Sequence, residues 1–257
     1  MSEKEDRDAS FIEDLERLKA EGKPVELVAA VGAYLKNVGK NFIPNDLDHS
    51  LQFLRGTVSI LKQDTDRCQE RYHEAFRAWA TDRQAQETYK LFQFELRQLI
   101  RTFFAEADGT IYAARQVLLW AHGRGELSLS IPELAVLREE SYRFNRRSKK
   151  AESRPAFNST IDSLLLAFSL LPGLRSSGFV LNLSDNGWEC FQKLLEVRNN
   201  ITHPKQLTDL AVDAEVTTQI LPAARSWYYR SLAMAVGDPL LTEAVALTGN
   251  PVLPLLR

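Results

Sequence analysis

The sequence is poor in the residues that build metal and redox sites. Its 257 residues include only 2 cysteines and 4 histidines. Cys68 and Cys190 are far apart and belong to no Cys-x-x-Cys pair, and His49, His73 and His122 are scattered without a His-Glu-x-x-His set. We therefore expect two reduced thiols, and neither a metal nor another cofactor.

Long apolar runs are also missing. The longest, residues 164–171, is much shorter than the roughly 20 residues that cross a bilayer as a helix. The first 22 residues are polar and acidic and lack the apolar segment of a signal peptide. These features predict a cytoplasmic protein that does not enter a membrane.

The motifs of several common enzyme classes do not occur. There is no glycine-rich phosphate loop, no Gly-x-Ser-x-Gly elbow and no internal repeat of roughly 20 to 50 residues. The net charge is −2, so the chain as a whole does not attract nucleic acid. Any RNA binding therefore requires a local positive patch.

Helical periodicity is the strongest positive signal. Between residues 46 and 108, a stretch without proline, apolar residues recur at steps of three and four in two series: Leu51, Leu54, Val58 and Leu61, then Tyr89, Phe92, Leu96, Leu99 and Phe103. We expect two or three antiparallel helices here, with turns at residues 64–66 or 81–82. Aromatic rings at this spacing favour a packed core over a platform for stacking bases.

Turn and capping residues divide the rest of the chain into further helices. We expect them after Ser10 and Pro24, at 111–121 following a turn at 108–110, from Pro132 through Phe144, at 161–171, from Trp188 onward, and from Asp213 to Met234 with a kink at Pro222. Strands are expected only as short pieces at 127–131 or 178–183.

The predicted fold class is therefore all-α, a helical bundle with additional N-terminal helices. We expect an N-terminal helical region at 1–107, a bundle at 108–236 and an apolar, proline-containing tail at 237–257. Residues 1–107 form either an added helical domain or the first helices of one enlarged bundle.

The densest cluster of positive charge lies at the end of the helix predicted from Pro132. It comprises Arg143, Arg146, Arg147, Lys149, Lys150 and Arg154. Cations suit the negative C-terminal end of a helix, and the cluster is then simply a solvated helix end. They also suit an arm that contacts the phosphate groups of RNA. Both interpretations are open at this point.

One short segment combines an arginine, an amide and a histidine. Residues 198–205 read RNNITHPK and end the amphipathic run that begins near Trp188. Pro204 disfavours the α conformation of the residue before it, so we expect the helix to end here. Asn199 lies one helical turn before His203, and a bend at residues 202–203 can bring Arg198, Asn199 and His203 around one point.

The spacing Arg-x4-His, with a polar residue after the arginine and a proline after the histidine, resembles the motif of the HEPN superfamily. HEPN domains are small α-helical bundles. Many are metal-independent endoribonucleases of toxin–antitoxin, abortive-infection and CRISPR-associated systems, and others are scaffolds or RNA-binding modules. In HEPN nucleases two copies of the motif face each other across a dimer. The resemblance therefore implies a homodimer with a composite site, an RNA substrate, and a partner such as an antitoxin or another defence-system protein.

The chemistry of the three residues agrees with RNA cleavage. A histidine can accept or donate a proton near neutral pH, and an arginine can bind a phosphate as negative charge builds on it. We expect Arg198 and His203 to be catalytic and Asn199 to orient either group or to bind a phosphate oxygen. The candidates for RNA binding are Arg143, Arg146, Arg147, Lys149, Lys150 and Lys205.

A structural role is the alternative for the same residues. Arg198 can cap the last carbonyls of its helix, and His203 can close the turn with a backbone hydrogen bond. The protein is then a non-catalytic helical scaffold, an RNA-binding module or a protein-interaction module.

Overall fold

The computed structural model describes residues 44–213 and 215–237. The chain divides after Pro44 into two units, and the second unit, Asn45–Arg257, contains all the elements treated below. The helices predicted after Ser10 and Pro24, and all but the first residue of the predicted tail at 237–257, lie outside the described residues.

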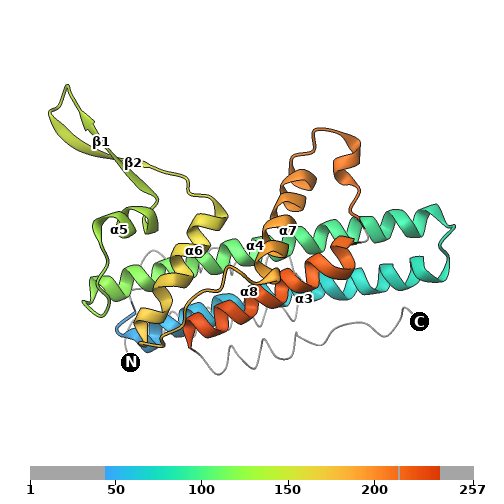
Figure 1. The fold of residues 1–257 in the computed structure, drawn as a ribbon, viewed down its shortest axis with the longest axis horizontal. Coiled ribbons are helices and arrows are strands. Elements are labelled where there is room, and N and C mark those ends of the chain that lie inside the picture. The colour runs from blue at the N-terminus through green and yellow to red at the C-terminus, as the bar shows by residue number, and fades with distance from the viewer. Residues whose placement is uncertain (1–43, 214, 238–257) are drawn as a thin grey trace, which may run out of the picture. The chain divides into compact units, whose positions relative to one another are not determined.

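Two long helices, joined by a turn at residues 82–85, form the frame of this unit (Figure 1). α3 spans Leu47–Thr81 and α4 spans Gln86–Gly123. The Asp82 carboxylate accepts hydrogen bonds from the Gln84 and Ala85 N–H groups at 3.3 and 3.2 Å, which stabilises the turn. The two predicted apolar series supply buried residues to the contact between the helices: Leu51, Leu54, Val58, Phe92, Leu96, Leu99 and Phe103. The predicted turn at 81–82 is confirmed.

Two other predicted turns are wrong, because both helices run through them. Residues 64–66 lie inside α3, where the buried Thr65 hydroxyl bonds to the Leu61 carbonyl of the preceding turn. Residues 108–110 lie inside α4. Gly109 packs against α3 there, and a Cβ atom on it would come within 2.6 Å of the Leu61 Cδ1 atom. The glycine therefore permits close packing of two helices and does not end one.

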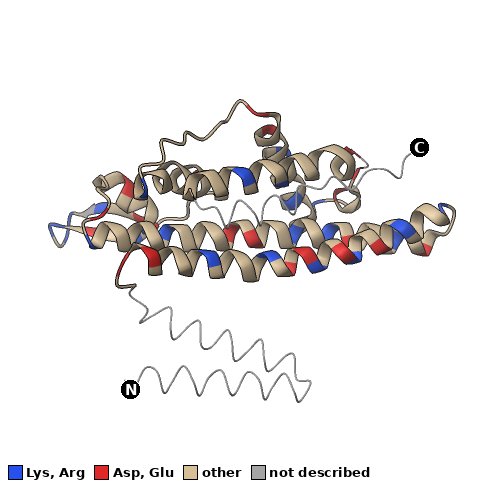
Figure 2. Cartoon of the chain, turned by 90° about the horizontal axis from the view of Figure 1, so that it is seen from below, with Lys and Arg blue, Asp and Glu red and all other residues tan. Residues whose placement is uncertain are grey.

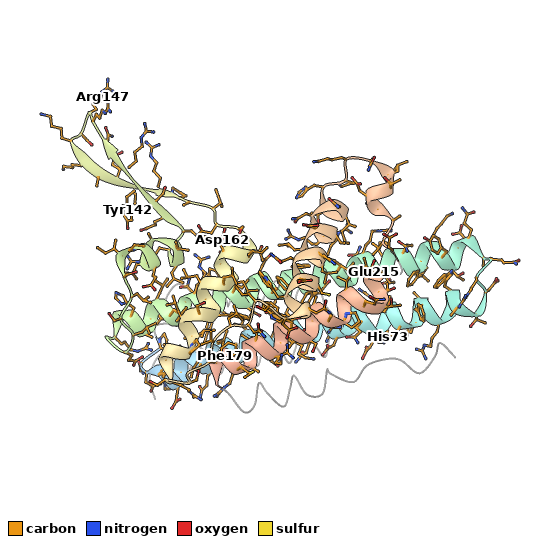
Figure 3. All side chains as sticks on the ribbon, viewed as in Figure 1. His73, Tyr142, Arg147, Asp162, Phe179 and Glu215 are labelled. Atoms are coloured by element: carbon orange, nitrogen blue, oxygen red, sulfur yellow. The ribbon has the colours of Figure 1, made fainter. Side chains whose placement is uncertain are left out.

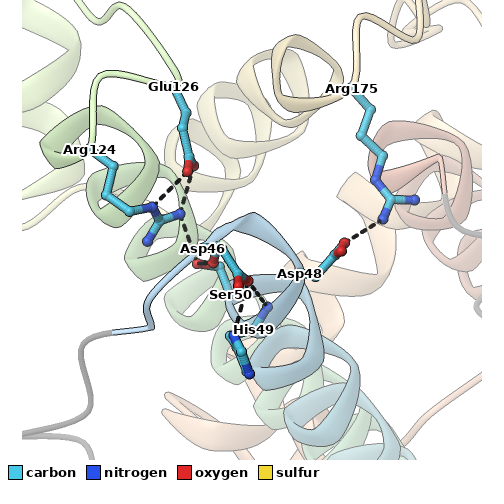
Figure 4. Close-up of polar contacts among 7 residues, drawn as sticks. All are labelled: Asp46, Asp48, His49, Ser50, Arg124, Glu126 and Arg175. Atoms are coloured by element: carbon cyan, nitrogen blue, oxygen red, sulfur yellow. Dashed lines mark hydrogen bonds and ion pairs between the residues drawn. The ribbon is translucent and has the colours of Figure 1, made fainter.

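A polar cluster ties the start of α3 to the end of α4 (Figure 4). Asp46 caps α3 by accepting the His49 N–H at 2.8 Å. Arg124 donates to both oxygens of Glu126 at 2.9 and 2.7 Å and to the Ser50 hydroxyl at 3.0 Å. The Asp46 bond satisfies a backbone N–H that the start of α3 leaves open, and the Arg124 bonds join this helix start to the residues that follow α4.

The helix predicted from Pro132 through Phe144 is wrong beyond its first two turns. Helix α5 spans Ile131–Leu137, and an antiparallel hairpin follows, with β1 at Glu140–Asn145 and β2 at Lys150–Pro155. The prediction that strands occur only at 127–131 or 178–183 is therefore wrong too.

A buried arginine explains why α5 stops. Arg115 of α4 donates to the Leu137 carbonyl at 2.9 and 2.5 Å and to the Glu139 carboxylate at 2.6 Å. Glu139 has a φ of 53°, which a helix does not allow. The chain is thus turned out of the helix by a residue more than twenty positions earlier, which no local pattern shows.

The remaining helices pack along α4 and complete a mostly helical unit. They are α6, Thr160–Leu170; η1, Leu171–Leu174; α7, Asn186–Thr202; η2, Leu207–Leu210; η3, a short π-helix at Val216–Ile220; and α8, Leu221–Val236. The largest fully buried side chains include Phe103, Phe104, Phe168, Phe191, Trp227 and Tyr228. The all-α prediction is confirmed at this level, with the hairpin as the one sheet in the described part of the chain.

The kink expected at Pro222 takes the form of a change in helix type. The π-helix η3 runs directly into α8, and Pro222 lies in the first turn of α8. Proline has no N–H to donate, and the first turn of an α-helix needs none. The proline therefore marks the start of α8.

Candidate functional site

Helix α7 carries the Arg-x4-His segment at its C-terminal end and is fixed at its start. Asp185 caps it by accepting the Gly187 N–H at 2.7 Å, and its other oxygen pairs with Arg230 of α8. Gly187 allows close approach to α8, since a Cβ atom there would come within 2.5 Å of the Trp227 Cβ atom. The buried side of α7 consists of Gly187, Trp188, Cys190, Phe191, Leu194 and Ile201.

The helix ends at Thr202, immediately before the histidine, as Pro204 predicts. The His203 N–H donates to the Asn199 carbonyl at 2.9 Å, and His203 leaves the helical conformation with φ −127° and ψ 61°. His203 is exposed, and its imidazole has no hydrogen-bond partner within the described part of the chain.

Arg198 is held at the surface by an acidic side chain of α4. Its Nη2 atom lies 3.3 Å from Asp108 Oδ2, and its Nη1 atom donates to Asn199 Oδ1 at 3.0 Å. The other Asp108 oxygen accepts the Thr160 hydroxyl of α6 at 2.9 Å. Three helices therefore fix the guanidinium, which is 28% exposed and has three N–H groups beyond these two bonds.

The structure joins two of the three predicted catalytic residues directly. Arg198 and Asn199 are hydrogen bonded, while the His203 ring is bonded to neither of them among residues 44–213 and 215–237. Arg198 also does not cap the end of its own helix. Arg101 of α4 occupies that role, because its guanidinium donates to the Ile201 carbonyl at 2.5 Å.

The loop after α7 is anchored to α4 by three polar side chains. They follow each other at four-residue intervals, so they lie on one face of the helix. The bonds join Gln93 to the Val212 carbonyl and N–H at 3.1 and 3.0 Å, Arg97 to the Leu210 carbonyl at 2.9 Å, and Arg101 to the Ile201 carbonyl. The segment that contains His203 and Lys205 is therefore held at both ends.

Two of these anchors place positive charge beneath the loop. Arg97 and Arg101 are half-buried neighbours on α4, and neither forms an ion pair within the described part of the chain. Burial lowers the pKa of Arg97, and the nearby charge of Arg101 lowers it further. Arg97 and Arg101 therefore place positive charge beneath a loop whose nearby carboxylates are Asp108 and Asp209.

Lys205 lies in a tight turn of the same loop. The Asp209 carboxylate accepts the Lys205 and Gln206 N–H groups at 2.8 and 3.1 Å. These bonds, above all the one from Lys205, lower the pKa of Asp209. Lys205 itself is exposed, two residues after His203.

The other predicted RNA-binding residues lie elsewhere, on the β1–β2 hairpin. Figure 3 labels Arg147 at its tip, and all five of Arg143, Arg146, Arg147, Lys149 and Lys150 are exposed. The structure thus divides the predicted RNA-binding residues into two groups: Lys205 lies in the loop after α7, and the other five lie on the hairpin.

A second polar cluster lies inside the bundle and is closed to solvent. The Tyr229 hydroxyl donates to Glu106 Oε2 at 2.8 Å, and Glu106 is 1% exposed. Burial raises the pKa of Glu106. Because it is closed to solvent, this carboxyl group is not a candidate for proton transfer to a substrate at the surface.

Several supporting residues escaped the sequence analysis. Asp108 and Arg198 are 90 positions apart, and no local pattern connects them. The stripe formed by Gln93, Arg97 and Arg101 was a usable signal, since long polar side chains at four-residue steps lie on one face of a helix.

Metal and membrane features are not found in the described part of the chain. Residues 44–213 and 215–237 contain no group of three potential metal ligands. None of their helices combines the length and the apolar character needed to cross a membrane. Comparison of the chain with family models, curated proteins and solved structures gives no match.

Proposed function

We propose that the protein is a metal-independent endoribonuclease that cuts single-stranded RNA at the C-terminal end of α7. The observation that carries the proposal is the surface arginine held by Asp108, a little more than one helical turn from an exposed histidine. Asp108 orients the guanidinium, and the bonds to Asp108 and Asn199 engage two of its five N–H groups. The others remain suited to two parallel hydrogen bonds with a phosphate.

In the proposed reaction His203 carries the proton. It accepts the proton of the ribose 2′-hydroxyl, whose oxygen then forms a bond to phosphorus while the bond to the 5′-oxygen breaks. The products are a 2′,3′-cyclic phosphate and a 5′-hydroxyl. Arg198 and Asn199 stabilise the negative charge that develops on the phosphate oxygens, and acid–base catalysis of this kind contributes roughly 10²- to 10⁴-fold.

The same chemistry requires a second proton carrier, because the departing 5′-oxygen must receive a proton from the opposite side. A second copy of the chain supplies it in our proposal, so the active form is a homodimer with a composite site, as the HEPN resemblance implies. The resemblance also implies a toxin–antitoxin or phage-defence role with a neutralising partner. Light scattering should find a dimer, and we expect residues 198–203 to lie in its interface. A monomer at concentrations well above cellular ones contradicts the composite site.

The direct test is a cleavage assay with single-stranded RNA in the presence of EDTA. We expect wild-type protein to cut, His203→Ala and Arg198→Ala to be inactive, and Asn199→Ala to be weakened less. His49→Ala is the matched control, because it removes an exposed histidine at the start of α3. Thermal melts of each variant show whether the protein stays folded.

A non-catalytic helical module is the second candidate, and the Arg198–Asp108 pair favours it. The pair links α7 to α4 and can exist for that purpose alone. This function predicts no cleavage by wild-type protein. It also predicts that Arg198→Ala costs about 0.2 to 1 kcal/mol of stability, the usual contribution of a partly exposed ion pair.

A further inference from the structure

The β1–β2 hairpin concentrates positive charge that the protein itself does not use. Residues 140–155 contain six cations and two carboxylates, a net charge of +4 in a chain whose net charge is −2. All six cations are exposed, and none forms an ion pair within the described part of the chain. Along α3 and α4, by contrast, acidic and basic residues are interspersed (Figure 2).

The turn of the hairpin is held in shape by neutral and acidic side chains. Asn145 Oδ1 accepts the Arg147 and Ser148 N–H groups at 2.9 and 3.2 Å. Glu152 Oε1 in turn accepts Asn145 Nδ2 at 2.5 Å and the Ser148 hydroxyl at 3.0 Å. The carboxylate nearest the cations is therefore engaged in fixing the turn, and the cations stay available.

The base of the hairpin is fixed as well. The Ala156 N–H donates to the Glu139 carbonyl at 2.7 Å, and buried Arg115 holds the Glu139 carboxylate. The hairpin thus extends from the helices as an ordered arm (Figure 1).

The pairing register arranges the charges along one face and around the tip. Arg143 pairs with Glu152, Asn145 with Lys150, and Ser141 with Arg154. Because side chains alternate along a strand, Arg143, Lys150 and Arg154 share one face. Glu152 lies on this face too, opposite Arg143, and Arg146, Arg147 and Lys149 follow at the tip, so the face and the tip together carry six cations and one carboxylate.

Solubility and protection of strand edges do not account for this pattern. Charged residues on exposed strands, lysine above all, discourage pairing between molecules, but Arg146, Arg147 and Lys149 lie in the turn and not on a strand. Six cations within sixteen residues of a chain with a net negative charge favour the binding of a polyanion. The tip residues, 145–150, include no apolar side chain to insert into a bilayer, which favours a nucleic acid over a membrane surface.

We propose that the β1–β2 hairpin is an arm that binds the phosphate backbone of RNA, separately from the site at the end of α7. The choice of RNA as the polyanion rests on the proposed function. Contacts of this kind are independent of base sequence and weaken as salt rises.

Binding of a fluorescent RNA with 2′-O-methyl groups tests the arm, because this RNA cannot be cut by attack of its own 2′-hydroxyl. Anisotropy titrations over a series of salt concentrations compare wild-type protein with the triple variant Arg143→Gln, Arg147→Gln, Lys150→Gln. The matched control is Arg67→Gln, Arg77→Gln, Lys90→Gln, which removes the same charge from exposed positions of α3 and α4.

The hairpin variant should bind at least tenfold more weakly at low salt. The slope of log affinity against log salt should also fall by about 2, since each lost phosphate contact on a single strand contributes about 0.7. The control should retain most of the wild-type affinity. The proposal that the hairpin binds RNA is overturned if the hairpin variant and the control variant bind RNA equally well. It is also overturned if wild-type protein binds no RNA, or if wild-type protein binds anionic phosphatidylserine vesicles and not RNA. If RNA binding depends on the hairpin but the protein cleaves no RNA, the nuclease proposal is wrong and the proposal that the hairpin binds RNA is supported.

Discussion

The loop after α7 and the β1–β2 hairpin are built alike and use their charges differently. In each, one side-chain oxygen accepts two backbone N–H groups: Asp209 in the loop, Asn145 in the hairpin. The arginines around the loop bind carbonyl or carboxylate groups of the protein. The cations of the hairpin form no ion pairs within the described part of the chain.

The loop after α7 therefore holds its charged groups in a fixed geometry, while the hairpin leaves its charges available to a ligand. Catalysis needs groups held in place, because small displacements of reacting atoms reduce the rate strongly. Binding to a nucleic-acid backbone needs charge that can reach many phosphates. We therefore propose that RNA is cut at the end of α7 and bound by the hairpin.

The largest expected effect concerns the anchor of the loop. Gln93→Ala leaves the Val212 N–H and carbonyl without their partner in a buried place, and should cost about 2 to 4 kcal/mol in the free energy of unfolding. Urea unfolding measures it. Gln192→Ala on the exposed side of α7 should change stability by less than about 0.5 kcal/mol. Equal losses in both variants contradict the anchoring role.

The pair that holds Arg198 should have a smaller effect. Arg198→Ala and Asp108→Asn should each lower stability by up to about 1 kcal/mol, with a coupling energy of about 0.2 to 1 kcal/mol in a double-mutant cycle. A coupling energy of zero shows that the contact does not fix the guanidinium.

The hairpin cations should contribute least to stability. The triple variant Arg143→Gln, Arg147→Gln, Lys150→Gln should unfold within about 0.5 kcal/mol of wild-type protein, because these side chains are exposed and form no ion pairs in the described chain. Thermal and urea unfolding of the variant check this. A larger loss of stability means that these charges help to fold the hairpin, and the hairpin then does not differ from the α7 loop in this respect.

The two turns should also respond differently to acid. The pKa of Asp209 is lowered below its ordinary value of 3.8, so its contribution is complete above that pH and is lost as the pH falls through the lower folded-state pKa. In NMR spectra the Lys205 and Gln206 amide signals should titrate below pH 3.8, and Asp209→Asn should remove this titration. The Arg147 and Ser148 amides bond to a neutral amide oxygen, which does not titrate.

Local sequence patterns predicted those parts of the fold that local forces determine. The apolar series on α3 and α4 and the end of α7 before Pro204 were both readable. The hairpin was not, because buried Arg115 stops α5 from a distance. The spacing from Leu137 to Tyr142 and Phe144 is five and then two, which no longer matched a helix.

The site was predictable to a similar degree. The segment from Arg198 to His203 was identified by its residue types and spacing. Its supports come from α4 and α6, and long-range contacts such as Arg198–Asp108 arise only once these helices pack. Gly109 was misread for the same reason, since its role is to let Leu61 approach.

The proposed division is between RNA cleavage at the end of α7 and RNA binding by the hairpin. Its most direct test is steady-state cleavage of single-stranded RNA in EDTA by three proteins. They are wild type, His203→Ala and the hairpin triple variant. The account predicts that His203→Ala lowers kcat by at least 10²-fold while RNA affinity is kept. The hairpin variant should raise KM and leave kcat unchanged. The account is contradicted if His203→Ala cuts as fast as wild type, or if the hairpin variant loses kcat while KM stays the same.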